Sequence, residues 1–235
     1  MNTLQHIYEP SRLLLVWRCA PSRGIRSRRL VALIEKDTHG GEVCLRYLTE
    51  TEDYIRAIES GFEGYPAFDL YNPVHCKGVI DAFMRRLPPR KRDDFKDYLL
   101  RHRLPIDTPI PDLSLLAYTN AKLPSDGFEV YPDLSDACPP FDLIIEVAGF
   151  RHQKDIDVND IYLGDPVDFK AEHENSHDPN AVGIYYSGVR IGFVDRAQAP
   201  SFRKWMRQGF SVKGTIERIN GTRAQPAVYV FVAIR

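Results

Sequence analysis

The chain has 235 residues, of which 43% are hydrophobic and 27% are charged, as in an ordinary soluble globular protein of one or two domains. Its formal net charge of −1 excludes a strongly basic or acidic protein, so nucleic-acid contact would have to come from a local distribution of charge. No apolar run approaches the roughly 18 residues that cross a bilayer, and the first residues lack the order of a secretory signal. We therefore expect a cytoplasmic protein that does not contact a membrane.

The four cysteines do not indicate a metal site. Cys19, Cys44, Cys76 and Cys138 are far apart in the sequence, and no two of them have the spacing of zinc ligands. In a cytoplasmic protein such residues are expected to be reduced, buried thiols. No sequence feature indicates a cofactor.

Residues 1–138 are predicted to form an α+β domain. Three short runs rich in β-forming residues predict a meander of strands: Arg12–Arg18, Arg29–Glu35 and Glu42–Leu48. Capping signals and apolar spacing then predict four helices: one after Thr49, one that opens at Pro73, and two over Arg90–Arg103 and Asp112–Asn120. Residues 123–140 contain four prolines, and we predict that they form a linker or strap, with the domain boundary near Cys138-Pro139-Pro140.

Residues 141–235 have a different pattern. Six short apolar runs predict strands over Leu143–Ala148, Pro166–Ala171, Ala181–Tyr186, Val189–Val194, Ser211–Ile219 and Ala227–Ile234. One amphipathic helix is predicted between the fourth and fifth strands, over Arg196–Arg207, with Gly209 as its stop. Six strands and one helix in so short a segment are typical of a small closed β-barrel of the OB or SH3-like type.

Charge is unevenly distributed within this second segment. Residues 141–186 contain three Lys or Arg and ten Asp or Glu, whereas residues 187–235 contain nine Lys or Arg and two acidic residues. Either the two halves pair their charges across one fold, or the barrel has a polarised surface with one face that binds phosphates.

The most specific motif of the chain lies in this segment. Asn175–Ala181 reads N-S-H-D-P-N-A, a loop of Asn and Asp residues whose side chains hydrogen-bond to local backbone before a buried strand. A hairpin signal, Ser187-Gly188, and the sequence Gly192-Phe193-Val194 follow. Upstream, Val147–His152 reads V-A-G-F-R-H, a strand end with a glycine before a basic side chain.

In this order and at this spacing, these blocks resemble the HIRAN domain, over about 40% of the chain. The resemblance implies a barrel that holds single-stranded DNA, in the best understood members at its 3′ end, where an aromatic ring stacks on a base and an acidic side chain accepts the terminal hydroxyl. We therefore expect a non-enzymatic protein with single-stranded or terminal DNA as its partner, in DNA repair or phage defence.

The resemblance also assigns residues to this site. Arg151 matches the arginine that contacts phosphate, and Asp178 matches the aspartate that accepts the hydroxyl. His152 and His177 stand where aromatic residues are usual, which weakens the expectation of 3′-end recognition. The remaining predicted contacts are Phe193 after the hairpin glycine, the nearby basic residue Arg196, and the basic face of the helix: Arg203, Lys204 and Arg207.

Each assignment has a structural alternative. Asp178 is also suited to organise its own loop, and Arg151 to pair with the acidic residues between positions 165 and 174. The basic helix face is also what an ordinary solvated helix presents, and Phe193 and Trp205 are also suited to a core. His173 and His177 lie in an irregular loop, not on a helix, which argues against a metal site there.

Residues 10–125 carry a fainter resemblance to the N-terminal subdomain of HipA-type serine/threonine kinase toxins. It rests on the predicted meander, on Tyr65-Pro66-Ala67-Phe68 and on the segment Leu115–Pro124. No kinase motif follows, and the chain has no phosphate-binding glycine loop, H-E-x-x-H or G-x-S-x-G sequence. The alternative function is thus an accessory or antitoxin-like subunit whose partner is a HipA-type kinase.

Overall fold

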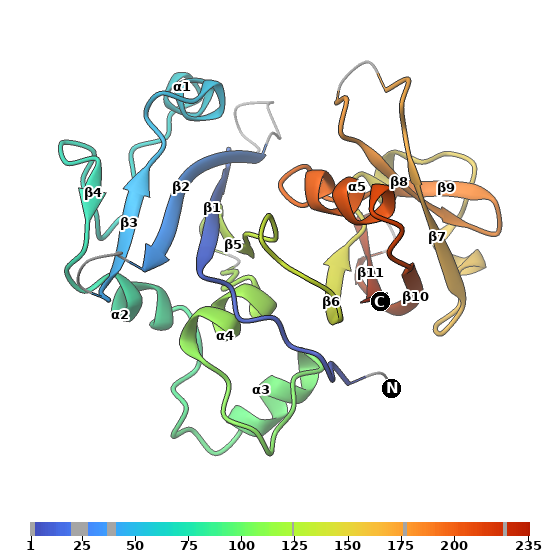
Figure 1. Cartoon of the computed structure of the whole chain (residues 1–235), viewed down its shortest axis with the longest axis horizontal. Coiled ribbons are helices and arrows are strands. Elements are labelled where there is room, and N and C mark those ends of the chain that lie inside the picture. The colour runs from blue at the N-terminus through green and yellow to red at the C-terminus, as the bar shows by residue number, and fades with distance from the viewer. Residues whose placement is uncertain (1–2, 20–27, 37–40, 124, 176–177, 223–224) are drawn as a thin grey trace. The chain divides into compact units, whose positions relative to one another are not determined.

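The computed structural model describes residues 3–19, 28–36, 41–123, 125–175, 178–222 and 225–235 (Figure 1). The chain forms two compact units. The N-terminal unit comprises residues 9–102 and 106–133, and the C-terminal unit comprises residues 134–235 together with the segments up to Tyr8 and from Arg103 to Pro105. Among the described residues, no helix has both the length and the apolar character needed to cross a membrane.

The described residues of the N-terminal unit form a five-stranded antiparallel sheet with four α-helices. The strands are β1 (Arg12–Arg18), β2 (Arg28–Lys36), β3 (Val43–Tyr47), β4 (Val74–His75) and β5 (Phe128–Pro132), in the order β4-β3-β2-β1-β5. The helices are α1 (Glu52–Glu59), α2 (Val79–Met84), α3 (Phe95–Arg101) and α4 (Asp112–Thr119).

The three predicted strands and the helix after Thr49 are confirmed, with Thr51 as the N-cap that accepts a hydrogen bond from the Tyr54 amide. The predicted first residue is wrong for two helices. Residues after Pro73 first form β4, because they pair with β3, and the helix begins only at Val79. The third helix begins at Phe95, since the residues from Arg90 to Asp94 are in turns.

Residues 123–140 are not the linker that their prolines predict. Phe128–Pro132 form β5, which pairs with β1 at the edge of the sheet. The buried guanidinium of Arg86 fixes this segment, because it donates to the Phe128 carbonyl at 3.0 Å and to the Asp126 carboxylate at 2.7 Å. These partners lie some 40 residues from Arg86 in the sequence, so the sequence pattern around β5 does not reveal them.

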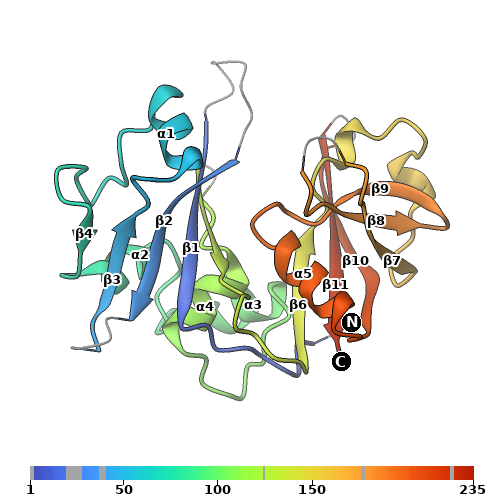
Figure 2. The same cartoon turned by 45° about the horizontal axis from the view of Figure 1, so that its top comes forward.

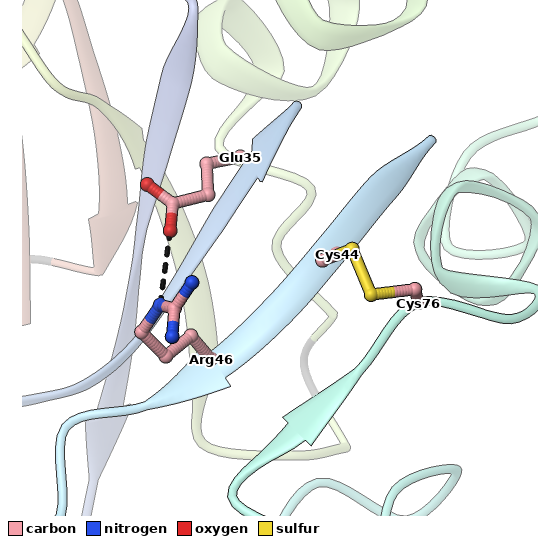
Figure 3. Close-up of a disulfide and its surroundings, with 4 residues drawn as sticks. All are labelled: Glu35, Cys44, Arg46 and Cys76. Carbon is pink, nitrogen blue, oxygen red and sulfur yellow. Dashed lines mark hydrogen bonds and ion pairs between the residues drawn. A yellow bond between two sulfur atoms is a disulfide. The ribbon is translucent and has the colours of Figure 1, made fainter. Parts of the chain in front are cut away.

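A disulfide joins Cys44 on β3 to Cys76, which directly follows β4 (Figure 3). The prediction of reduced, buried thiols is therefore wrong for these two residues. Cys19 is a free, buried thiol as predicted, whereas Cys138 is free but exposed. Leu45 on β3 pairs with His75 on β4. Cys44 directly precedes Leu45 and Cys76 directly follows His75, so the antiparallel pairing brings the two cysteines opposite each other. The bond closes a loop across 32 residues and holds the short edge strand β4 on the sheet.

The C-terminal unit is a curled, six-stranded antiparallel sheet, a half-barrel with one helix (Figures 1 and 2). Its strands are β6 (Phe141–Glu146), β7 (Pro166–Ala171), β8 (Val182–Tyr186), β9 (Val189–Phe193), β10 (Val212–Thr222) and β11 (Gln225–Ile234). Their order is β6-β11-β10-β7-β8-β9. All six predicted strands and the predicted barrel class are confirmed.

Helix α5 (Ala199–Arg207) closes the core of this unit. It packs against β8 and β10, and its Phe202 and Trp205 are completely buried. The Trp205 ring lies 4.9 Å from that of Phe141 on β6, and the Phe202 ring lies 5.5 Å from that of Phe169 on β7, centroid to centroid. Trp205 is thus a core residue, as the sequence pattern predicts.

The buried carboxylate of Asp142 holds the start of β6 in place. Asp142 accepts hydrogen bonds from the backbone amides of Gln5 and His6 at 2.9 and 3.0 Å and from the guanidinium of Arg235 at 2.5 Å. Burial alone would raise the pKa of Asp142, but the donors from Arg235 and the two amides outweigh it and lower that pKa below its ordinary value. Asp142 therefore stays ionised while it joins three separate stretches of the unit.

Removal of the disulfide should destabilise the N-terminal unit. The double variant Cys44→Ala, Cys76→Ala should lower the free energy of unfolding by about 3 kcal/mol, because the unfolded chain regains the entropy of the open loop. Urea unfolding measures this, with Cys138→Ser as the control that should have no effect. Thiol titration of the unfolded, unreduced protein should find two thiols, Cys19 and Cys138; four would show that the bond does not form.

Asp142 should make the C-terminal unit sensitive to acid. Because its folded pKa is lowered, its stabilising contribution is complete above the unfolded pKa of about 4 and is lost as pH falls through the lower, folded pKa. Asp142→Asn should cost about 3 kcal/mol at pH 7, and the difference from wild type should shrink below about pH 4. Thermal unfolding across this range measures both, with the exposed Asp168→Asn as control. A difference that is constant with pH would contradict the assignment.

Candidate nucleic-acid interface

The sequence blocks on either side of the Asn175–Ala181 loop meet where the two edge strands of the sheet, β6 and β9, come together. Beyond β6, Ala148 exchanges two backbone hydrogen bonds with Phe193 of β9, at 2.8 and 2.9 Å. Gly192 permits this contact, because a Cβ there would stand 2.5 Å from the Ala148 oxygen and 2.6 Å from Cγ1 of Val147. The V-A-G-F-R-H block and the G-F-V block are therefore neighbours in space.

Arg151 and His152 lie on a short 3-10 helix, η2 (Phe150–His152), directly after this junction. Gly149 starts the turn with a φ of +77°, a value that favours glycine, and Phe150 anchors it in the core. Both polar side chains are exposed, and Nε of Arg151 donates to Nε2 of His152 at 3.1 Å. Among the described residues Arg151 has no ion pair, so the alternative of a pair with residues 165–174 finds no support.

Asp178 organises its loop, as its structural alternative has it. Its backbone amide donates to the side chain of Asn175 at 3.1 Å, and its own Oδ1 accepts the amide of Asn180 at 2.8 Å. The second bond makes an Asx turn, and the Ala181 amide donates to the Asp178 carbonyl directly before β8. His177 lies outside the described residues.

Phe193 presents part of its ring to solvent beside a cation. The guanidinium of Arg190 lies 4.8 Å from the ring centroid, within the range of a cation–π contact. Phe193 is half-buried, whereas its neighbours Gly192 and Val194 are buried. The ring is therefore partly at the surface and not wholly in the core, and the backbone of Phe193 pairs with Ala148, three residues before Arg151.

The basic residues of helix α5 divide into two kinds. Arg203 donates to the Pro179 carbonyl at 2.7 Å, and Lys204 donates to the Ser135 carbonyl at 2.7 Å, so both hold the helix to neighbouring loops. Arg207, at the helix end, and Arg196, just before the helix, are exposed. The contact of Arg203 also holds the loop of Asp178 in place.

Charges of the acidic and basic halves pair in part. Arg235 pairs with Asp142, and Arg190 lies 3.7 Å from Glu172. Within the part of the chain that the structure describes, none of the predicted cations of the interface has an ion pair with an acidic residue, so the structure combines the two alternatives that the charge distribution leaves open.

Sequence reasoning missed Arg190 as a member of this surface. The signal was present: Arg190 alternates with the buried Ile191 along β9, and alternation places it on the outer face. Its distance from the ring of Phe193 depends on the bulge between β8 and β9, which no sequence pattern gives.

Comparison with known proteins decides what this half-barrel is. The sequence model of the HIRAN domain matches residues 140–233. These residues form a HIRAN domain. The match includes none of the N-terminal unit's strands or helices, and there the resemblance to HipA-type kinases stays a prediction. The HIRAN domain indicates DNA binding in a general sense.

Two solved structures are similar to the chain. The HIRAN domain of human HLTF has 16% identity and a TM-score of 0.34, over 40% of this chain and 74% of that one. A Lactobacillus plantarum protein has 20% identity and a TM-score of 0.34, over 39% of this chain and 92% of that one. Both scores are too low to place site residues. No curated protein matches the chain.

The closure of the sheet at Gly192 can be tested directly. Gly192→Ala should lower the free energy of unfolding by about 2–3 kcal/mol, because backbone must move away from the new methyl group. Gly188→Ala is the control, since its φ is +82° but a Cβ there would have nothing within 4 Å; it should cost only about 1 kcal/mol for the left-handed backbone. Equal losses for the two variants would mean that the contact with Ala148 is not tight.

Proposed function

We propose that the protein is a non-enzymatic DNA-binding protein whose HIRAN domain holds a single strand at its 3′ end. The observation that carries the proposal is the position of Arg151. Its exposed guanidinium, which has no ion pair among the described residues, extends from a turn that follows Ala148, and the backbone of Ala148 pairs with that of the half-exposed Phe193. A cation next to a ring is the combination that binds a phosphate and stacks on its base.

The roles of the other residues follow from their contacts. Asp178 uses Oδ1 to cap its loop, but a carboxylate has further lone pairs, so it can also accept a bond from a terminal hydroxyl. Arg196 and Arg207 are exposed and suited to the backbone of the strand. Arg203 and Lys204 contribute by holding helix α5 to the loops at Pro179 and Ser135. Such a strand-end binder would serve in DNA repair or phage defence.

The first experiment measures the affinity for oligonucleotides. Filter binding of labelled single strands at two salt concentrations, with free and blocked 3′ ends, should give tighter binding to the free end. Arg151→Ala should weaken binding and reduce the slope of log K against log salt by roughly one, because one phosphate contact is lost. The exposed lysine on β10, in the variant Lys213→Ala, is the control that should leave the slope unchanged.

Failure of the wild-type protein to bind any DNA at low salt would overturn the proposed function. Binding that ignores the chemistry of the 3′ end would leave a general single-strand binder and remove the end-specific role.

Two variants of Asp178 separate its roles. Asp178→Asn keeps an oxygen that can accept the Asn180 amide and removes the charge, so the fold should persist while the preference for a free 3′ hydroxyl weakens. Asp178→Ala removes the loop cap as well and should also lower the melting temperature. If Asp178→Asn keeps the full preference for the free end, Asp178 organises the loop and does nothing more.

A further inference from the structure

The outer face of β7, β8 and β9 carries side chains that the HIRAN resemblance does not assign. Alternation along the strands places Lys170, Tyr185 and Arg190 on this face. The residues that directly precede the first two, Phe169 and Ile184, are buried in the core. Tyr185 opposes Arg190 in the register of β8 and β9, so the two side chains are neighbours across the hairpin.

Two cation–aromatic pairs surround one carboxylate there. The Lys170 ammonium lies 4.5 Å from the ring centroid of Tyr185, and the Arg190 guanidinium lies 4.8 Å from that of Phe193. Glu172 joins the pairs, because its Oε1 accepts the Tyr185 hydroxyl at 2.5 Å and its Oε2 lies 3.7 Å from Arg190. The hydrogen bond to Glu172 and burial raise the pKa of Tyr185, so its phenol stays neutral.

Gly183 makes room for this arrangement. A Cβ at Gly183 would collide with the carboxylate of Glu172 and stand 2.8 Å from Cε2 of Tyr185. The ring of Tyr185 thus lies close to the backbone of its own strand, and it is only half-buried. The ring has a fixed position on the sheet, and the side chain that lies over it is the exposed, flexible Lys170, which a base can replace.

This face is continuous with the proposed DNA site. Phe193 belongs to both, since its backbone pairs with Ala148 beside the turn of Arg151 and its ring contacts Arg190. Glu172 begins the loop that leads to Asp178, and its amide donates to the carbonyl of Ala181 at the end of that loop. A strand held at Arg151 and Phe193 has this face next to it.

The charges on the face distinguish stacking from phosphate binding. Lys170 and Arg190 are balanced by Glu172 and by Asp168, which opposes Tyr185 on β7, so the formal charges cancel. A balanced surface gives little attraction for phosphates, whereas a fixed aromatic ring stacks on any base.

We propose that the outer face of β7–β9 is a second nucleotide subsite, at which the base of a further unpaired nucleotide of the same DNA strand stacks on Tyr185. The inference rests on the proposed function. It predicts that Tyr185 contributes to the affinity for longer strands only, and with no change in salt dependence.

Two substitutions at Tyr185 test this in the full-length protein. Tyr185→Thr removes the ring but keeps a strand-forming residue, and Tyr185→Phe keeps the ring but loses the hydrogen bond to Glu172. Affinities for a thymidine dinucleotide and a hexanucleotide, both with free 3′ ends, are measured by NMR titration at two salt concentrations. Tyr185→Thr should bind the hexanucleotide about tenfold more weakly, with the dinucleotide affinity and the salt slope unchanged, while Tyr185→Phe should bind like wild type.

The control is Tyr162→Thr. Tyr162 is 64% exposed, and it lies near Tyr186, whose side chain points to the opposite face of β8 from that of Tyr185. This variant should bind both oligonucleotides like wild type. Thermal unfolding of every variant shows that the fold persists.

Other outcomes overturn the inference in distinguishable ways. Wild-type affinity in Tyr185→Thr for both lengths would mean that no base stacks there. Equal losses in Tyr185→Thr and Tyr185→Phe would assign Tyr185 a structural role through Glu172. Equal losses for the two lengths would place it in the terminal subsite. If the wild-type protein binds neither oligonucleotide, the proposed function itself fails.

Discussion

One close approach of two backbones shapes the C-terminal unit. Gly192 lies against Ala148 with no space for a side chain, and the bonds between Ala148 and Phe193 bring the two edges of the curled sheet together. The turn with Arg151 and the end of β9 meet only because of this contact, although about 40 residues separate them in sequence. The candidate DNA site is therefore a product of how the sheet closes.

The second constraint is that the charged side chains that hold segments of the unit together are not the ones that remain at its surface. Several charged residues of the unit hold segments together: Asp142 with Arg235, Arg103 with Glu217, and Arg203 with the Pro179 carbonyl. Buried or half-buried polar groups need such partners, since an unpaired one costs about 1–3 kcal/mol. The cations that remain at the surface are fewer than the basic composition of residues 187–235 suggests, and the proposed site depends on those few.

Local patterns predicted the half-barrel well. Its strands are short alternating runs separated by Gly, Asn and Pro residues, and for such runs the period of two fixes both the strand and its buried face. The helix was also predicted from a local pattern, because Phe202 and Trp205 recur at helical spacing. The Asx loop of Asp178 was also predictable, since Asn175 and Asp178 act on backbone two or three residues away.

Features that depend on distant partners were not predictable. Strand β5 lies in a proline-rich segment and exists because β1 and Arg86 bind it. The Cys44–Cys76 disulfide has no characteristic spacing, and only the pairing of β3 with β4 brings the two residues together. The same applies to the outer face of β7–β9, where a bulge sets which side chains oppose one another.

The boundaries of the HIRAN match differ from the boundaries of the folded C-terminal unit. A fragment cut at Pro140, where the match begins, would lose the Ala137 carbonyl that accepts the indole N–H of Trp205 at 3.2 Å. It would also lose the amides that bind Asp142 and the arginine that pairs with Glu217. The unit is thus assembled from three stretches of chain, and its final strand, β11, is made last. During synthesis on the ribosome, the N-terminal unit can fold first, whereas the early segments of the DNA-binding unit must wait for β11 to emerge.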